Sequence, residues 1–256
     1  MKITKLFLCV PVGWAALTQT ITAQNISGFN ENFNGYSTDG DLTAAWTRAS
    51  GTTANIGLVA DPDPSGTHGQ SIFQTSASNV GQLTKSFATG ITPTDANPVI
   101  FSFDFYDVNG GTTTGRNYVE LRNASGTGGL FDAGLINSVT TGIYNQSGYQ
   151  ARNIDSGAWI QLAATRSVGW HTFEFDIRAT TVDLKIDGVI DANFNNLHWN
   201  GGAVYNLIKV GSALSSNTTA DYDNISVVVV PEPSIVAFSL LAGFGLLWHV
   251  VKRQRG

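Results

Sequence analysis

Residues 169–176 read GWHTFEFD and residues 182–189 read VDLKIDGV, and these two runs decide the fold that the sequence predicts. In both runs hydrophobic residues alternate with polar ones, which is typical of strands with one buried face. The apolar positions are Phe173, Phe175, Ile177, Val182, Leu184 and Ile186. Asp187 and Gly188 then favour a turn with positive φ. The two runs are therefore predicted to be adjacent antiparallel strands.

The same alternation recurs between residues 24 and 230. It occurs at Val99, Phe101, Phe103 and Phe105, at Val119 and Leu121, and at Ile160 and Leu162. Turn-forming segments, such as residues 61–66, 109–111 and 200–202, separate these runs. Many short strands joined by turns rich in Gly and Asn predict an all-β fold, an antiparallel β-sandwich.

The composition is typical of a β-rich extracellular protein. Of the 256 residues, 42% are hydrophobic and 13% are charged, against about 25% charged in an average soluble domain. This length allows one domain with short appendages, and the hydrophobic content excludes a wholly disordered chain. The formal net charge of −5 opposes a phosphate backbone, so we expect no nucleic-acid partner.

The first 23 residues are expected to form a signal peptide. Lys2 and Lys5 precede an apolar run over residues 6–17, and signal peptidase could cut after the small residue Ala23. The alternative is a short buried helix or an uncleaved anchor, but the run is too short to span a bilayer. The chain's single cysteine, Cys9, lies in this run, so the mature protein is predicted to lack disulfides.

The C-terminal segment predicts a transmembrane helix. Residues 235–251 form an apolar run of 17 residues, which as a helix reaches roughly 25 Å, the short end of a bilayer span. A basic cluster follows, made of Lys252, Arg253 and Arg255. Such a cluster stays in the cytoplasm, which leaves everything before Pro231 outside. The alternative is a buried C-terminal helix.

A short motif precedes this run: Pro231, Glu232 and Pro233. Together, the motif, the apolar run and the basic end over residues 231–256 resemble the PEP-CTERM sorting signal of Gram-negative bacteria. The resemblance implies processing by exosortase, a membrane-embedded protease, while the tail is held in the inner membrane. It also implies release to the cell surface or the extracellular matrix. The two prolines favour an extended segment that a protease cleft can accept.

The expected mature domain, residues 24–230, is more acidic than the whole chain. Leaving out five basic residues at the two ends and Glu232 gives nine basic and 18 acidic residues, a net charge of −9. This balance favours solubility outside the cell and neutral rather than anionic polysaccharide as a partner.

Two features of the body resemble the concanavalin A-like or laminin-G-like jelly roll. Its members often carry a W-H-x-F strand, found here at residues 170–173, and a following strand that ends in I-D-G, found here at residues 186–188. Residues 29–36 and 221–227 fit the opening and closing strands of such domains. The resemblance implies that these first and last strands lie side by side.

The resemblance also implies a structural calcium ion near those strands. Glu31, Asp221 and Asp223 would be its ligands, because carboxylate oxygens are the ligands that calcium prefers. The alternative is that Asp221 and Asp223 are solvated residues at the end of a strand. No other cofactor is expected.

No catalytic site is predicted. Laminarinase-type glycoside hydrolases, which share this jelly roll, carry Glu-x-Asp-x-Glu on one strand, but here Glu174 and Asp176 are followed by Arg178. Arginine can act neither as nucleophile nor as acid in glycoside hydrolysis. We therefore expect the two carboxylates on the solvent face of an ordinary strand, and His171 as a core or edge residue.

Aromatic rings are the candidates for ligand contact, because they can stack on sugar faces. Trp199 lies among polar residues and is predicted to be exposed, and Trp159 is the second candidate. Tyr106, Tyr144 and Tyr149 are further candidates, and each of these rings could equally lie in the core.

These observations predict an exported, non-catalytic sandwich that acts in the cell envelope or matrix, with exopolysaccharide as the expected partner. The alternative is a glycan-active enzyme, a hydrolase or lyase, on the same scaffold. A pair of carboxylates in a groove would favour the enzyme.

Overall fold

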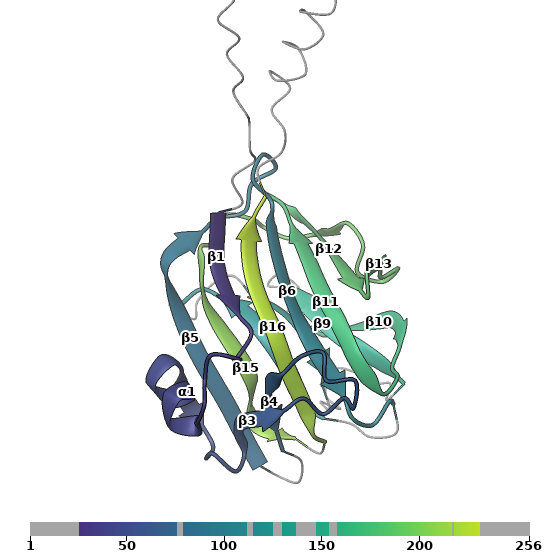
Figure 1. Cartoon of the computed structure of the whole chain (residues 1–256). Helices are drawn as coiled ribbons and strands as arrows, with labels where there is room; N and C mark the ends of the chain where they lie inside the picture. Colours follow the sequence, from purple (N-terminus) through teal and green to yellow (C-terminus); the bar gives the residue numbers. More distant parts are fainter. Residues whose placement is uncertain are drawn as a thin grey trace, which may run out of the picture.

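The computed structural model (Figure 1) describes most of the expected mature domain and neither end of the chain. The described residues are 26–75, 79–111, 115–124, 130–136, 147–153, 158–216 and 218–230. The expected signal peptide with Ala23, the sorting motif, the apolar run and the basic cluster lie outside them. Within these ranges, no helix has the length and apolar character to cross a membrane.

The described residues form two antiparallel sheets and one short helix, so the predicted all-β sandwich is confirmed. The front sheet of Figure 1 has nine strands. Seven of them follow the order β13 (Val189–Ile190), β12 (Thr181–Ile186), β11 (Gly169–Ile177), β6 (Val99–Asp107), β16 (Ala220–Val229), β4 (Gln70–Gln74) and β3 (Ile56–Ala60). Two more pair at the side: β1 (Ile26–Glu31) with β16, and β14 (Leu197–His198) with β12.

The back sheet has seven strands. Their order is β10 (Ile160–Thr165), β9 (Gly148–Asn153), β8 (Leu130–Leu135), β7 (Asn117–Arg122), β15 (Tyr205–Ser216), β5 (Asn79–Ile91) and β2 (Thr47–Ser50). The helix, α1 (Asp39–Ala45), lies beside the edge strands β3 and β2 (Figure 1) and begins at a capping box between Thr38 and Asp41.

Residues 169–176 and 182–189 lie on adjacent antiparallel strands, as predicted. In β11 and β12, Phe173 is opposite Ile186 and Ile177 is opposite Val182, and the turn beyond them has positive φ at Asp187 and Gly188. The inward residues of β6 and β11 pack as stacked rings: Phe103 on Phe173 and Phe101 on Phe175, with centroids 5.2 and 5.7 Å apart. Period-two alternation therefore identified the centre of the core correctly.

The first and last described strands lie side by side, as the resemblance implied. Strand β1 runs antiparallel to β16, with Phe29 opposite Val227 and Glu31 opposite Ile225. This pairing closes the front sheet and brings residues from both ends of the domain to one place.

Candidate functional site

The outer face of the back sheet carries a row of four charged residues on four neighbouring strands. Lys209 on β15 is opposite Glu120 on β7, Glu120 is opposite Asp132 on β8, and Asp132 is opposite Arg152 on β9. Side chains directly opposite each other lie about 4.5–5.5 Å apart at Cβ. We call these four residues the charged row. Its formal charges cancel, because two acids stand between two bases.

Two arginines bind the two acids. Arg152 donates from Nε to Asp132 Oδ2 at 2.8 Å, and Arg122, two residues beyond Glu120 on β7, donates from Nη1 to Glu120 Oε2 at 3.2 Å. The acids are buried, at 0% and 3% exposure for Asp132 and Glu120, whereas the arginine side chains keep about a quarter of their surface in solvent. The site therefore has an acidic floor and a basic rim.

The floor is electrostatically unusual, because like charges face each other directly. Burial raises the pKa of Asp132 above its ordinary value; Arg152 opposes this shift and the charge of Glu120 adds to it. Arg152 stays charged in any case, since a guanidinium does not lose its proton in proteins. A buried acid with a raised pKa beside a second acid is a feature found at binding and catalytic sites.

Aromatic rings border the charged row. Trp159 lies under Arg152, whose guanidinium is 4.8 Å from the ring centroid, and its ring is 5.4 Å from that of Tyr118. The hydroxyl groups of Tyr118 and Ser212 are 3.1 Å apart. Burial raises the pKa of Tyr118 to about 12, so its hydroxyl keeps its proton. These rings form a small apolar cluster separate from the main core.

Two polar atoms of this face have no hydrogen-bond partner within the described residues. They are Oδ1 of Asp132, an acceptor, and Nε of Arg122, a donor. Most buried polar atoms in proteins are paired, so each such exception needs an explanation. A hydroxyl group that accepts from Arg122 Nε and donates to Asp132 Oδ1 would satisfy both atoms. Because both atoms are buried, such a group must displace the side chains that cover them.

Sequence analysis identified only one residue of this face, and that residue lies at its border. Trp159 was a predicted ligand contact and borders the charged row, at 6% exposure. Tyr118, Glu120, Asp132 and Arg152 were missed. Their common signal is a polar residue at every second position of three consecutive strands, which the sequence alone cannot distinguish from a solvated face.

The prediction that Trp199 is exposed is wrong. Its side chain is 0% exposed, its Nε1 donates to the backbone oxygen of Arg178 at 3.1 Å, and its ring meets that of Phe131 at 5.4 Å. The polar neighbours of Trp199 face solvent while the ring itself fills the core. Tyr149 is also buried, with a ring 5.1 Å from that of Phe173, and Tyr144 lies outside the described residues.

The residues predicted to hold calcium do not fit a metal ion. The carboxylate of Glu31 accepts hydrogen bonds from the backbone of Phe33 and from Tyr36, Trp46 and Lys85. Asp221 and Asp223 are 4% and 0% exposed, and no set of three or more His, Cys, Asp or Glu side chains in the described ranges is arranged to hold a metal. We therefore assign no calcium ion to these residues.

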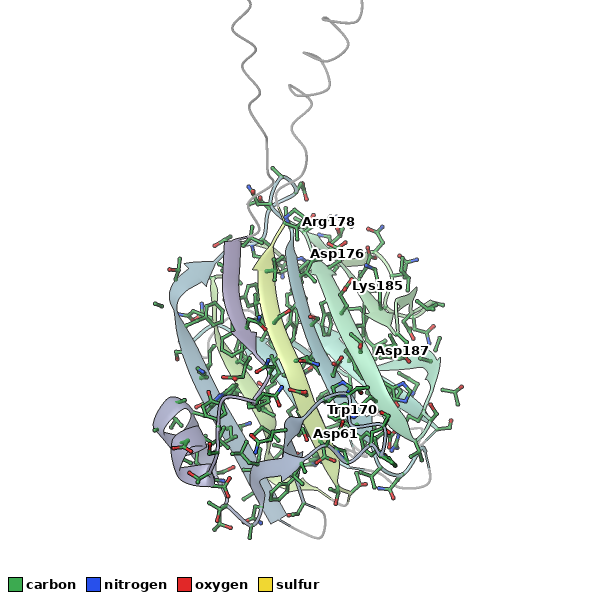
Figure 2. The ribbon with its side chains drawn as sticks, viewed as in Figure 1. Asp61, Trp170, Asp176, Arg178, Lys185 and Asp187 are labelled. Atoms are coloured by element: carbon green, nitrogen blue, oxygen red, sulfur yellow. The ribbon has the colours of Figure 1, made fainter. Side chains whose placement is uncertain are left out.

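Two outward acids of the front sheet, Glu174 and Asp176, form ion pairs within the chain. Glu174 accepts from Lys185 at 2.6 Å and Asp176 from Arg178 at 2.9 Å, on the outer face where the alternation placed them. Figure 2 labels Asp176, Arg178 and Lys185. His171 lies at the rim of the core, on the interior strand β11; its ring is 5.5 Å from that of Tyr149 and forms hydrogen bonds with Ser167 and Asp187.

The loop between β3 and β4 is fastened across the lower part of the same face. Trp170 donates from Nε1 to Asp61 at 3.0 Å, the ring of His68 stacks on Trp170 at 4.0 Å, and His68 Nε2 lies 3.1 Å from Asp104 (Figure 2). Since these groups bind one another, we assign them to holding the loop.

Comparison with known proteins supports the fold. No family model and no curated protein matches the sequence. Among solved structures, the globular domain of T. cruzi calreticulin is 12% identical, with a TM-score of 0.55, and the match covers 84% of this chain and 92% of that one. A sialidase is 9% identical with a TM-score of 0.52, over 80% of this chain but only 18% of that one.

A third structure, described with endo-acting O-glycanases of the human gut microbiota, is 11% identical with a TM-score of 0.50, over 80% of this chain and 99% of that one. At these identities the likeness shows the fold alone, a two-sheet antiparallel sandwich of the jelly-roll type.

Proposed function

We propose that this protein is exported and binds neutral polysaccharide, without catalysis, in the cell envelope or extracellular matrix of a Gram-negative bacterium. The charged row, with Arg122 and Trp159, is the binding face. The observation that carries this proposal is the pair of unpartnered atoms, Asp132 Oδ1 and Arg122 Nε, on one buried polar face.

Sugar chemistry matches this face. Each hydroxyl of a sugar can accept from an arginine and donate to a carboxylate, so one hydroxyl or two adjacent ones would satisfy both atoms. Hydrogen bonds to charged groups are stronger than those between neutral groups. The sialidase and O-glycanase names among the structural relatives agree with a glycan ligand.

The charge balance favours a neutral sugar. The binding face, with Arg122 included, has three bases and two acids, whereas the expected mature domain carries a net charge of −9, so the repulsion of a uronic or sulfated polymer by the domain would outweigh the single positive charge in excess at the face.

A glycan array followed by calorimetry tests binding. Arg122→Met removes the unpartnered donor at a partly exposed side chain, and we expect affinity for the retained glycan to fall about tenfold or more. Glu174→Gln, on the other sheet, is the matched control and should bind like the wild type. Absence of retention of any neutral glycan, or equal loss in both variants, would refute the binding face.

Export rests on the two ends of the chain. Signal peptidase would remove residues 1–23, and exosortase would act at Pro231, Glu232 and Pro233 on a membrane-tethered intermediate. The test follows the protein in its own bacterium with and without residues 231–256. Full-length protein retained in the cytoplasm would overturn the proposed location.

A glycoside hydrolase is the second candidate, and the opposite placement of Glu120 and Asp132 favours it. Retaining glycosidases hold their two carboxyl groups about 5–5.5 Å apart, one ionised and one protonated. Glu120 would attack the sugar and Asp132 would protonate the leaving group. Release of reducing ends by the wild-type chain, and its loss in Glu120→Gln, would establish the enzyme, whereas binding without release excludes it.

A further inference from the structure

Glu31, the first residue of the predicted calcium set, lies at the centre of a tight cluster of hydrogen-bond donors. Its Oε2 accepts from Tyr36 Oη at 2.7 Å, Lys85 Nζ at 2.8 Å and Trp46 Nε1 at 3.2 Å. Its Oε1 accepts from the backbone N–H of Phe33 at 3.2 Å. Lys85 Nζ also lies 3.3 Å from Tyr36 Oη.

Aromatic rings surround the lysine in this cluster. Lys85 Nζ is 5.3 Å from the ring centroid of Trp46 and 5.7 Å from that of Phe29, within the range of cation–π attraction. The side chains of Glu31 and Lys85 are 11% and 28% exposed. The ammonium group thus lies between a largely buried carboxylate and two aromatic rings.

Both partners of the ion pair are held in their charged forms. Burial alone would raise the pKa of Glu31, but hydrogen bonds from Lys85 and Tyr36 keep it below its ordinary value. Burial alone would lower the pKa of Lys85, but its hydrogen bond to Glu31 and the negative charge there raise it.

The cluster joins parts of the domain that are distant in sequence. Glu31 ends β1 of the front sheet, Lys85 lies on β5 of the back sheet, and Trp46 directly follows α1. Glu31 and Lys85 are 54 residues apart. A bound ion at the end of the first strand would connect the same segments.

A metal ion could not share this carboxylate without displacing the lysine. Calcium takes six to eight oxygen ligands, roughly, at about 2.3–2.6 Å, whereas here N–H and O–H groups point their hydrogens at Glu31. The two positive charges would also repel each other at this distance.

We infer that Lys85 is a built-in replacement for a metal ion: its ammonium supplies the positive charge that closes β1 onto the back sheet, so the fold does not depend on calcium. Being part of the chain, this cation cannot be removed by chelating polymers outside the cell. The inference is independent of the glycan-binding proposal, because Lys85 is paired with the core residue Ile208 on the inner face of the back sheet, whereas the charged row lies on the outer face.

The test compares two lysine variants of the purified full chain by thermal unfolding, with excess EGTA and with millimolar CaCl2. Lys85→Met leaves the mostly buried Glu31 unpaired, and we expect its melting temperature to fall by about 5–15 °C. Lys185→Met is the matched control, because Lys185 is as exposed as Lys85, at 29% and 28%, whereas its partner Glu174 is 33% exposed against 11% for Glu31. An exposed pair of this kind should change the melting temperature by about 2 °C or less.

Wild-type protein should melt at the same temperature with EGTA and with CaCl2. A lower melting temperature in EGTA would overturn the inference, as would equal effects of the two lysine substitutions. Stabilisation of Lys85→Met, but not of the wild type, by CaCl2 would support it further, since it would show that a metal can occupy the place that the lysine vacates.

Discussion

Replacing Asp223 by asparagine should stabilise the protein at alkaline pH and leave it unchanged at acidic pH. Asp223 is 0% exposed, stands opposite Asp104 on β6, and neither carboxylate oxygen forms a hydrogen bond of normal geometry within the described residues. Burial, and then the charges of Asp104, Asp61 and Glu31, raise its pKa from 3.8 to about 7; the backbone N–H of Asn224 opposes the shift without cancelling it.

The sign follows from linkage between protonation and folding. Well below pH 3.8, Asp223 is protonated in both the folded and the unfolded chain, so its raised pKa does not lower the free energy of unfolding. As the pH rises through 7, the unfolded chain has already lost the proton, and the folded chain must either keep it or bury a charge. The raised pKa therefore removes stability between about pH 4 and pH 7, and the full loss is present above pH 7.

The size of the loss has an upper bound. A shift from 3.8 to about 7, at about 1.36 kcal/mol per unit, gives roughly 4 kcal/mol. Local rearrangement relieves part of this, so we expect Asp223→Asn to gain about 2 kcal/mol at pH 8. For a domain of this size that gain raises the melting temperature by about 4–8 °C.

The assay is thermal unfolding of wild type and Asp223→Asn at pH 4, 6 and 8. Asp63→Asn is the matched control, because asparagine can keep the hydrogen bond that Asp63 accepts from Ser65. If the melting temperatures of wild type and Asp223→Asn changed equally with pH, the reasoning would be refuted. A loss of stability at pH 8 in Asp223→Asn would refute it too, since it would show that the charged carboxylate is needed there. Part of the pH dependence should remain in the variant, because burial also raises the pKa of Asp221 to about 7.

Three further substitutions test the packing. Trp199→Ala should cost about 3–5 kcal/mol in denaturant unfolding, because it empties a fully buried site, and a cost below about 1 kcal/mol would contradict its place in the core. Gly134→Ala should weaken glycan binding as well as stability, because at φ +143° the new Cβ would lie 2.2 Å from the backbone oxygen of Asn117 and force β8 away from β7; unchanged affinity would argue against the binding face. Asp107→Asn should destabilise the fold by about 3–5 kcal/mol at neutral pH, because it breaks the buried pair with Arg166, and the difference should shrink in acid, where the wild-type carboxyl is protonated too.

Sequence patterns predicted the elements that have one apolar and one polar face. Phe173 and Phe175 on β11 gave a clear period of two, because the outward residues between them, Thr172, Glu174 and Asp176, are polar and partly solvated. The same reasoning failed for Trp199, because its burial depends on how the segment around β14 folds over the sandwich and not on its polar neighbours in sequence.

The charged row could not be found in this way. On β7, Tyr118 and Glu120 are as well buried as Val119 and Leu121 on the opposite face, so the pattern of burial does not alternate. The row exists only through strand register, which places Glu120 beside Asp132 and Asp132 beside Arg152. The Glu31 cluster is hidden for the same reason, since its lysine comes from the other sheet.

The unpartnered atoms of the charged residues differ between the two sheets. On the front sheet, Asp223 and Asp176 leave only carboxylate oxygens unpaired, and a proton can satisfy a carboxylate, as the raised pKa of Asp223 and Asp176 indicates. On the back sheet, Nε of Arg122 is a donor that no change of protonation can satisfy, and it needs an acceptor from outside the chain. A group that accepts from Arg122 Nε and donates to Asp132 Oδ1 would satisfy both atoms at once. A ligand with adjacent hydroxyl groups therefore fits the back sheet, whereas the front sheet can satisfy its own charges with protons alone.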